Sequence, residues 1–131
     1  MLRLEDRLDD ETEDLIYRTI GCCIEVHKAL GPGLLEKIYV RAICIELTLA
    51  GIPFEVQKSY PVTYRDKLLC DQTVDIVVAG KLLLEIKAVE RLAPVHQAQV
   101  ISYLRVSKLK VGLIMNFNEA YLPNGTKRIV V

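Results

Sequence analysis

The chain has 131 residues, of which 51% are hydrophobic and 26% charged, and its 17 basic side chains balance 17 acidic ones. This length predicts one domain over residues 1–131 with a sizeable hydrophobic core, and this composition excludes a disordered chain. The balanced charge excludes a global attraction to nucleic acid, so any contact with phosphate has to be local.

The apolar pattern predicts elements in the order ααβββαβ, with a further strand at the end. Residues 1–10 are charged and are expected to fray, and Gly31-Pro32-Gly33 separates the first two helices. An antiparallel meander followed by a helical crossover gives an α/β (α+β) fold, with a mixed sheet of four to five strands flanked by helices. The expected helices cover residues 10–29, 34–49 and 94–107, and the expected strands cover 54–63, 67–78, 82–87, 110–116 and 127–131.

The most informative segment is an apolar hairpin that carries three charged side chains. Its two apolar runs, residues 74–78 and 82–87, are interrupted by Asp75, Glu85 and Lys87. Side chains alternate along a strand, so Glu85 and Lys87 share a face. A two-residue loop would place Asp75 on the opposite face from Glu85, whereas a three-residue loop or a bulge places both on one face. We therefore predict an odd-length loop or a bulge at this turn.

These three side chains suit divalent-metal phosphodiester chemistry. Charges within apolar strands are costly to bury unless they are paired or bind a metal ion. Carboxylate oxygens suit Mg²⁺ or Mn²⁺, which polarises a phosphoryl group and activates water, and Lys87 could orient that water. The alternative is an edge hairpin whose Glu85 and Lys87 face solvent. Four basic residues are candidate phosphate contacts near this site, unless they form an ordinary solvated surface: Arg91, Arg105, Lys108 and Lys110.

Four helical residues are candidates to join the site. Glu36 lies at the start of the second helix, and Gln99 and Tyr103 are four residues apart on the third helix, so they share a face. The third helix is expected to pack near the end of the strand that contains Glu85, where an amide and a hydroxyl can position a phosphate or a water. His96 is a further positioning candidate, with helix capping as the alternative.

The four cysteines, Cys22, Cys23, Cys44 and Cys70, have no C-x-x-C pair and no regular spacing. We expect them to be buried and reduced in a cytoplasmic protein. No apolar stretch approaches the roughly 20 residues of a membrane span. The charged N-terminus also lacks the apolar core of a signal peptide. These features predict a cytoplasmic location without membrane contact.

Asp75 followed by Glu85-Ile86-Lys87 resembles the motif of the PD-(D/E)xK nuclease superfamily, which has a restriction-endonuclease-like αβββαβ core. In that superfamily the Asp and Glu bind Mg²⁺, the Lys assists catalysis, and a Glu from the preceding helix often joins the site. The resemblance therefore implies that Asp75, Glu85, Glu36 and the backbone carbonyl of Ile86 bind Mg²⁺ or Mn²⁺. It also implies that Lys87 is catalytic.

A closer resemblance is to the GxxExxY family of small bacterial and archaeal proteins. Gly33-Leu-Leu-Glu36-Lys-Ile-Tyr39 carries its signature, and Gln99-Val-Ile-Ser-Tyr103 matches the Gln-x-x-x-Tyr motif of RecB-like exonuclease domains. The resemblance covers nearly the whole chain, from about residue 12 to the end. The chain departs from the superfamily pattern at Val74, where a proline would precede the aspartate.

Three functions are consistent with these residues. The leading one is a Mg²⁺-dependent nuclease that hydrolyses DNA phosphodiester bonds. The second is a non-catalytic nuclease-like module that binds nucleic acid or a protein partner, which the neutral charge favours and the intact Asp, Glu and Lys disfavour. The third is a small hydrolase of nucleotides or other phosphoesters. Base specificity would require a homodimer or a protein partner, and the strand over residues 127–131 could pair with a second chain or complete its own sheet.

Overall fold

The computed structural model describes residues 7–131 and confirms the predicted fold class. The elements are α1 (Asp10–Leu30), α2 (Glu36–Leu49), β1 (Phe54–Tyr64), β2 (Lys67–Val78), β3 (Leu82–Lys87), α3 (Pro94–Ser107), β4 (Val111–Asn116), η2 (Leu122–Gly125) and β5 (Thr126–Val130). Fraying was expected for residues 1–10, of which residues 1–6 lie outside the described part. The expectation is wrong at Asp10, which already belongs to α1, because the Asp9 carboxylate caps this helix by accepting a hydrogen bond from Thr12 N at 3.1 Å.

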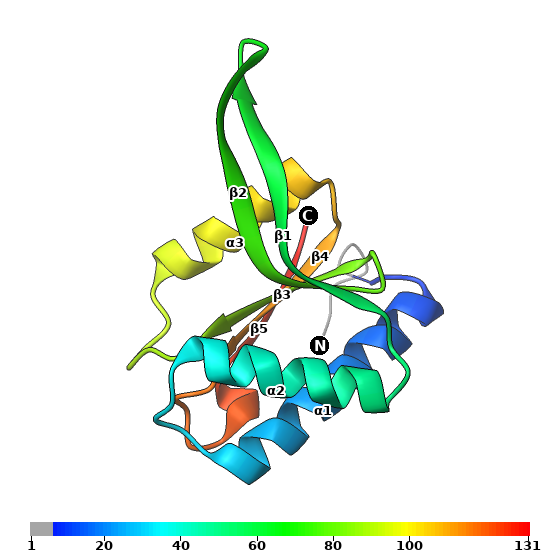
Figure 1. The fold of residues 1–131 in the computed structure, drawn as a ribbon, viewed down its shortest axis with the longest axis vertical. Helices are drawn as coiled ribbons and strands as arrows, with labels where there is room; N and C mark the ends of the chain where they lie inside the picture. Colours follow the sequence, from blue (N-terminus) through cyan, green and yellow to red (C-terminus); the bar gives the residue numbers. More distant parts are fainter. Residues whose placement is uncertain (1–6) are drawn as a thin grey trace.

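The strands form one mixed sheet in the order β1-β2-β3-β4-β5, with helices on both faces (Figure 1). Strands β3 and β4 are parallel because α3 crosses over between them, and the other neighbours are antiparallel. Helices α1 and α2 cover one face, where Tyr39, Ile43 and Leu47 are fully buried against the sheet. Helix α3 covers the other face with Val100 and Leu104. Strand β5 completes the protein's own sheet by pairing with β4.

The turn between β2 and β3 has three residues, which confirms the predicted odd-length loop. The strands pair as Ile76–Leu84, Val77–Leu83 and Val78–Leu82. Ala79 and Gly80 close the turn with φ angles of 52° and 67°. In this register Val77 and Leu83 face α3, whereas Ile76, Val78, Leu82, Leu84 and Ile86 face α1 and α2.

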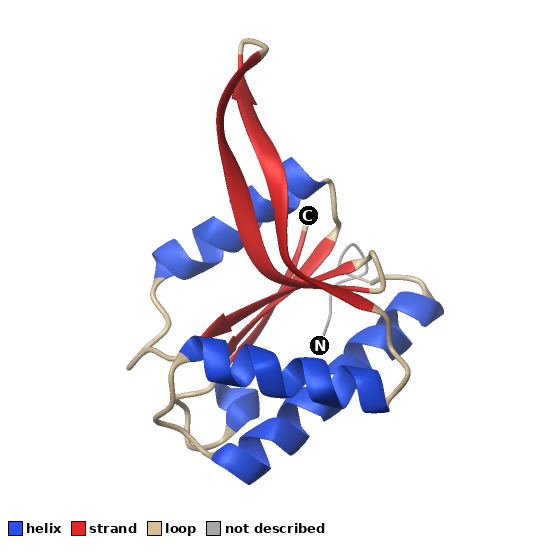
Figure 2. Cartoon of the chain, in the orientation of Figure 1, coloured by secondary structure: helices blue, strands red, loops and turns tan. Residues whose placement is uncertain are grey.

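Beyond these three pairs, β2 leaves β3 and continues with β1 as a two-stranded arm, residues 58–74 (Figure 2). A two-residue turn at Arg65 and Asp66 ends the arm, and both residues have positive φ angles, as a tight hairpin turn requires. The arm joins the sheet at Gln57 and Asp75, which lie opposite each other between the pairs Val56–Ile76 and Lys58–Val74. Asp75 therefore stands at the point where the arm leaves the sheet.

The connection between α1 and α2 is held by Tyr39, the last residue of the Gly-x-x-Glu-x-x-Tyr segment. Its hydroxyl donates a hydrogen bond to Gly31 O at 2.6 Å and accepts one from Leu34 N at 3.0 Å. Its ring stacks on Phe117 with the centroids 4.6 Å apart. Gly33 has a φ angle of 107°, which favours glycine. This tyrosine therefore fixes the place where α2 begins, which is the place of Glu36.

The cysteines are all free thiols, and two of them are buried as predicted. Cys22 and Cys23 lie in the core of α1, where burial raises the pKa of both thiols, and Cys44 is half-buried. The prediction is wrong for Cys70, which is exposed because it lies on the arm, away from the sheet. No helix within residues 7–131 is long and apolar enough to cross a bilayer.

Gly112 sets how closely α3 approaches the sheet, and it gives a test of this packing. A Cβ at Gly112 would lie 2.9 Å from Val100 Cγ1, whereas a Cβ at Gly21, in the middle of α1, would meet nothing within 4 Å. We expect Gly112→Ala to lower the free energy of unfolding by about 1–3 kcal/mol through overpacking. The matched change Gly21→Ala should raise it by about 0.5–1 kcal/mol. Urea unfolding measures both, and equal stability of Gly112→Ala and wild type would contradict this α3 packing.

Candidate functional site

Two carboxylates, Asp75 and Glu85, lie side by side at the point where β2 leaves β3. Glu85 is only 5% exposed. Burial, together with the neighbouring Asp75 carboxylate, raises the pKa of Glu85 to about 8, while the charge of Lys87 acts in the opposite direction. Like charges in a buried site cannot both ionise cheaply, so the pair holds a proton at neutral pH.

The side chain of Asp75 is held in this position because it accepts a hydrogen bond that a strand carbonyl would otherwise accept. Its Oδ2 accepts a hydrogen bond from Ile86 N at 2.8 Å, at the point where the β2–β3 pairs end. The carboxylate thus replaces the strand carbonyl that an unbroken ladder would offer to this amide. This bond fixes Asp75 against β3 next to Glu85.

Lys87 and α3 complete the cluster. Lys87 Nζ donates to Gln99 Oε1 across 3.4 Å, which is a long hydrogen bond. Burial, and then the charges of Glu85 and Asp75, raise the pKa of Tyr103, so this residue lies within electrostatic reach of both carboxylates. The structure therefore brings together five of the predicted residues from β2, β3 and α3.

Asn116, which the sequence analysis did not single out, holds the end of β3 in place. Its side chain is buried, accepts a hydrogen bond from Val89 N at 3.1 Å and donates one to Val89 O at 2.9 Å. Phe117 N donates to Lys87 O at 2.8 Å. A polar residue at the end of the apolar run of β4 was the available signal. Asn116 therefore fixes the backbone that carries Lys87.

The remaining predicted residues lie at the rim. Glu36 is exposed as the first residue of α2, and it lines a groove that Asp75 also lines. His96 Nδ1 accepts a hydrogen bond from Ala93 N at 2.9 Å, so His96 caps α3. Within residues 7–131, no group of three or more His, Cys, Asp and Glu side chains stands close enough to hold a metal ion. Glu36 and the carbonyl of Ile86 thus stay predicted ligands beside the carboxylate pair.

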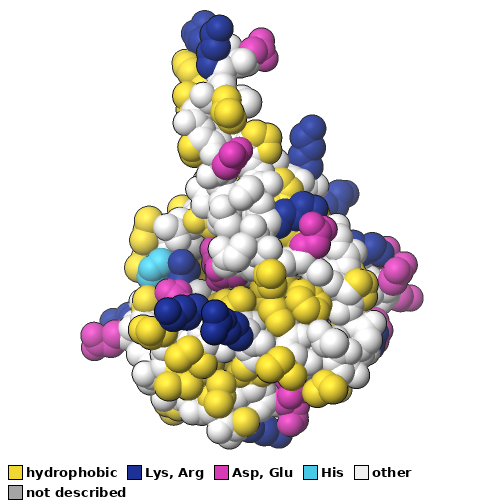
Figure 3. Space-filling model, viewed as in Figure 1, with side chains coloured by type: hydrophobic (Ala, Val, Ile, Leu, Met, Phe, Trp, Pro, Cys, Tyr) yellow, Lys and Arg dark blue, Asp and Glu magenta, His cyan; other side chains and the backbone are white. Residues whose placement is uncertain are grey.

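The groove that joins Glu36 to Asp75 was not predicted. It has a volume of about 830 Å³ and lies between α2 and the place where β1 enters the arm. Figure 3 shows apolar side chains gathered over this region, with basic side chains next to them. Its lining residues are Glu36, Lys37, Val40, Arg41, Cys44, Ile45, Phe54, Val56, Gln57 and Asp75.

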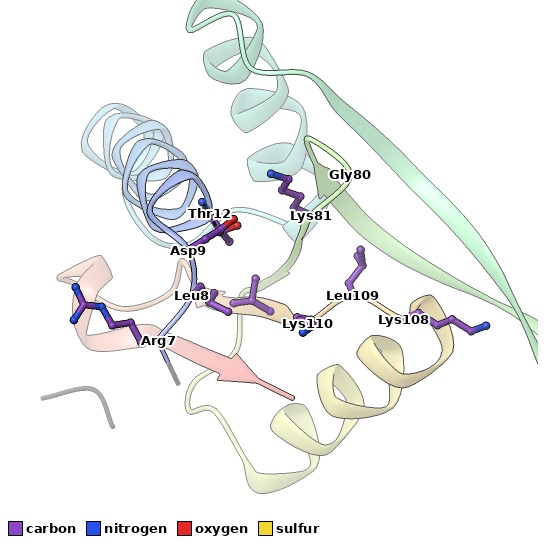
Figure 4. A pocket seen from close by; sticks show the side chains of 10 residues that line it. Arg7, Leu8, Asp9, Thr12, Gly80, Lys81, Lys108, Leu109 and Lys110 are labelled. Carbon is purple, nitrogen blue, oxygen red and sulfur yellow. Dashed lines mark hydrogen bonds between the residues drawn. The ribbon is translucent and has the colours of Figure 1, made fainter. Parts of the chain in front are cut away.

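The prediction that Lys108 and Lys110 contact phosphate near the carboxylates is wrong. They precede β4, whose first residue pairs with Leu82, whereas Glu85 and Lys87 pair with the other end of β4. Lys108 and Lys110 instead line a cavity of about 450 Å³ at the far end of the sheet (Figure 4). Arg7 and Lys108 point away from each other across this cavity, and Lys81 pairs with Glu11 at 3.1 Å, so its cations do not converge on one anion.

The other two predicted phosphate contacts differ from each other. Arg91 is exposed in the loop that directly follows β3, at the same end of the sheet as Lys87. Arg105 is exposed on α3, turned by about 200° from Tyr103 because each helical residue advances by about 100°. Arg91 therefore remains a predicted phosphate contact, and Arg105 points away from the carboxylates.

The donor set fits a hard divalent cation. Asp75 and Glu85 offer oxygen ligands from neighbouring strands, and their mutual repulsion is relieved when a cation replaces the shared proton. Mg²⁺ binds through one or two carboxylates and completes its coordination with water and substrate phosphate. A pair of carboxylates beside an open groove is therefore sufficient for such an ion.

The raised pKa of Glu85 predicts a pH-dependent stability of the metal-free protein. The unfolded chain releases this proton near the ordinary pKa of 4.5, and the folded chain releases it near 8. Between these values the folded state binds more protons than the unfolded chain. The contribution of this proton to the free energy of unfolding is therefore fully present below pH 4.5 and is lost as pH rises through 8. In EDTA we expect Glu85→Gln to flatten this part of the melting-temperature profile. The exposed control Glu90→Gln should keep the wild-type slope, and a parallel profile for Glu85→Gln would contradict the shared proton.

The fold and the site together define a restriction-endonuclease-like domain with its acidic and lysine side chains on the central hairpin. A family model of the PD-(D/E)XK nuclease superfamily matches residues 13–129. The chain therefore belongs to the PD-(D/E)XK nuclease superfamily. No curated protein and no solved structure gives a significant match.

Proposed function

We propose that the protein is a nuclease that uses Mg²⁺ or Mn²⁺ to hydrolyse DNA phosphodiester bonds. The observation that carries the proposal is the contact between the half-buried Asp75 and the buried Glu85, with Lys87 two residues further along β3. Without a cation the two groups hold a proton, and the strands keep them together through the Asp75–Ile86 hydrogen bond, so a divalent cation can take the place of that proton. Membership of a nuclease superfamily supports the same conclusion.

In this proposal Asp75 and Glu85 hold the ion, with Glu36 and the carbonyl of Ile86 as further ligands. When bound, the ion activates water and neutralises charge on the phosphate. Lys87 holds the attacking water with its ammonium and offsets the charge that develops on the phosphoryl oxygens. Gln99 keeps the ammonium in place through its hydrogen bond, and the Tyr103 hydroxyl and the second nitrogen of His96 position the phosphate.

We also assign the chain to the GxxExxY group within the superfamily. Glu36 and Tyr39 support this assignment because Tyr39 fixes the loop that places Glu36 at the groove. We propose further that the protein is cytoplasmic and has one domain. Its partners in the proposal are DNA and, for sequence specificity, a second copy or another protein.

The test is cleavage by the purified protein. We expect labelled DNA to be cut in Mg²⁺ or Mn²⁺ and to stay intact in EDTA, with single-stranded, duplex and branched DNA assayed side by side. If no substrate is cut with either ion, the nuclease proposal fails.

A second candidate function is a nuclease-like module that binds nucleic acid or a protein without cleaving. The observation that favours it is the absence, among the described residues, of a third side chain close enough to complete a metal group. Gel-shift titration against salt separates the two binding modes: a steep loss of DNA affinity indicates several phosphate contacts, and no shift at all indicates a protein partner. Binding without cleavage would support this candidate.

A further inference from the structure

We propose that the groove between α2 and β1 binds an unpaired nucleotide of the substrate strand, next to the bond that is cut. The proposal rests on the nuclease function and adds the class of substrate, which is single-stranded nucleic acid or a single-stranded end. It concerns the groove of about 830 Å³ that begins at Asp75.

The groove is continuous with the candidate metal site. Asp75 and Glu36 both line it, so a chain whose phosphate lies at Asp75 has its neighbouring nucleotide within the groove. The rest of the lining is mainly apolar: Val40, Cys44, Ile45, Phe54 and Val56. Ile45 is 62% exposed and Val56 is 47% exposed, so water contacts these side chains in the free protein. Covering them with a base would remove apolar surface from water.

The cations of the groove suit a phosphate backbone. Lys37 and Arg41 both line it and are four residues apart on α2, so they lie on the same face of the helix. Neither forms an ion pair with any residue in the described part of the chain. An apolar floor beside a row of cations is the arrangement that binds single strands, in which bases stack and phosphates face charge.

An unpaired nucleotide fits better than a duplex. In a duplex the faces of each base are covered by its neighbours, so an apolar wall gains contact only when a base is unstacked. Phe54 offers a half-buried aromatic ring for such a base. Gln57, which also lines the groove, has a φ angle of 50°, a costly conformation that tends to occur at functional sites. Its amide can donate to and accept from the edge of a base.

The test measures binding of fluorescein-labelled oligothymidine and of a duplex of equal length by fluorescence anisotropy. We would use the Asp75→Asn background in EDTA, which removes one carboxylate charge and prevents cleavage. The single strand should bind about tenfold more tightly than the duplex, and Ile45→Asp should weaken single-strand binding by about tenfold, as expected for the loss of one stacked base. The control Leu49→Asp changes an apolar residue of the same helix that is 77% exposed and outside the groove, and should have little effect.

Arg41→Gln gives a second measurement. It should reduce the slope of log affinity against log salt concentration for the single strand by about one, the loss of one phosphate contact. Equal binding of both probes, or equal effects of Ile45→Asp and Leu49→Asp, would overturn the groove proposal. These outcomes are distinct from failure of the nuclease function. Single-strand cleavage that Ile45→Asp leaves unchanged would overturn the groove alone, whereas single-strand binding in the groove without cleavage in Mg²⁺ or Mn²⁺ would overturn the nuclease alone.

Discussion

Replacing Asp75 by asparagine should weaken Mn²⁺ binding by at least about 100-fold and remove DNA cleavage with it. Asparagine keeps an oxygen that can accept the hydrogen bond from Ile86 N, so the fold should be retained while the charge is lost. Alanine at this position would also leave that amide without its partner, at a cost of about 1–3 kcal/mol in stability. Calorimetric titration with Mn²⁺ and thermal unfolding measure the two effects separately.

Asp71 provides a matched control for this experiment. It lies on the same strand as Asp75 but is exposed on the arm, away from the carboxylate pair. Asp71→Asn should therefore bind Mn²⁺ as wild type does. Wild-type affinity in Asp75→Asn would show that the ion binds elsewhere and would remove the main support for metal-dependent cleavage.

Replacing Lys87 by methionine should lower kcat by about 10²–10³-fold at saturating Mn²⁺, because it removes a positive charge aimed at the phosphate in the transition state. Methionine keeps most of the side-chain length, so the packing against α3 changes little. Binding of the ion should persist, since Asp75 and Glu85 are retained. Single-turnover cleavage, together with Mn²⁺ titration, separates a chemical defect from a loss of the ion.

Lys110→Met is the control for Lys87→Met, because Lys110 lies at the opposite end of the sheet. Its cleavage rate should equal that of wild type. If Lys87→Met cleaves at the wild-type rate, Lys87 has no part in the chemistry, and its hydrogen bond to Gln99 is structural.

The elements of the fold could be predicted because each follows from a local pattern. Turn length alone fixed the register of β2 and β3, and hence the side-by-side placement of Asp75 and Glu85. The apolar run of β4, residues 111–115, likewise reflects its burial on both faces between β3 and β5.

The parts that could not be predicted depend on long-range geometry. Lys108 and Lys110 are close to Tyr103 in sequence, but α3 carries the chain from one end of the sheet to the other, because β3 and β4 are parallel. The departure of β2 from β3 has no local signal, so the exposure of Cys70 was missed. The groove was missed for the same reason, since its walls come from α2 and β1 and meet only in the folded chain.

The arm has a consequence for the behaviour of the protein at high concentration. Within residues 7–131 its two strands have no further sheet neighbour beyond Ile76, and such open edges can pair with other chains and start aggregation. Three features of the arm oppose this: Pro61 lacks an N–H group, a bulge between Val62 and Thr63 interrupts the ladder, and Lys58 adds charge to β1. The arm therefore carries its own protection against edge-to-edge association, and variants made for crystallisation or concentrated assays should leave these features unchanged.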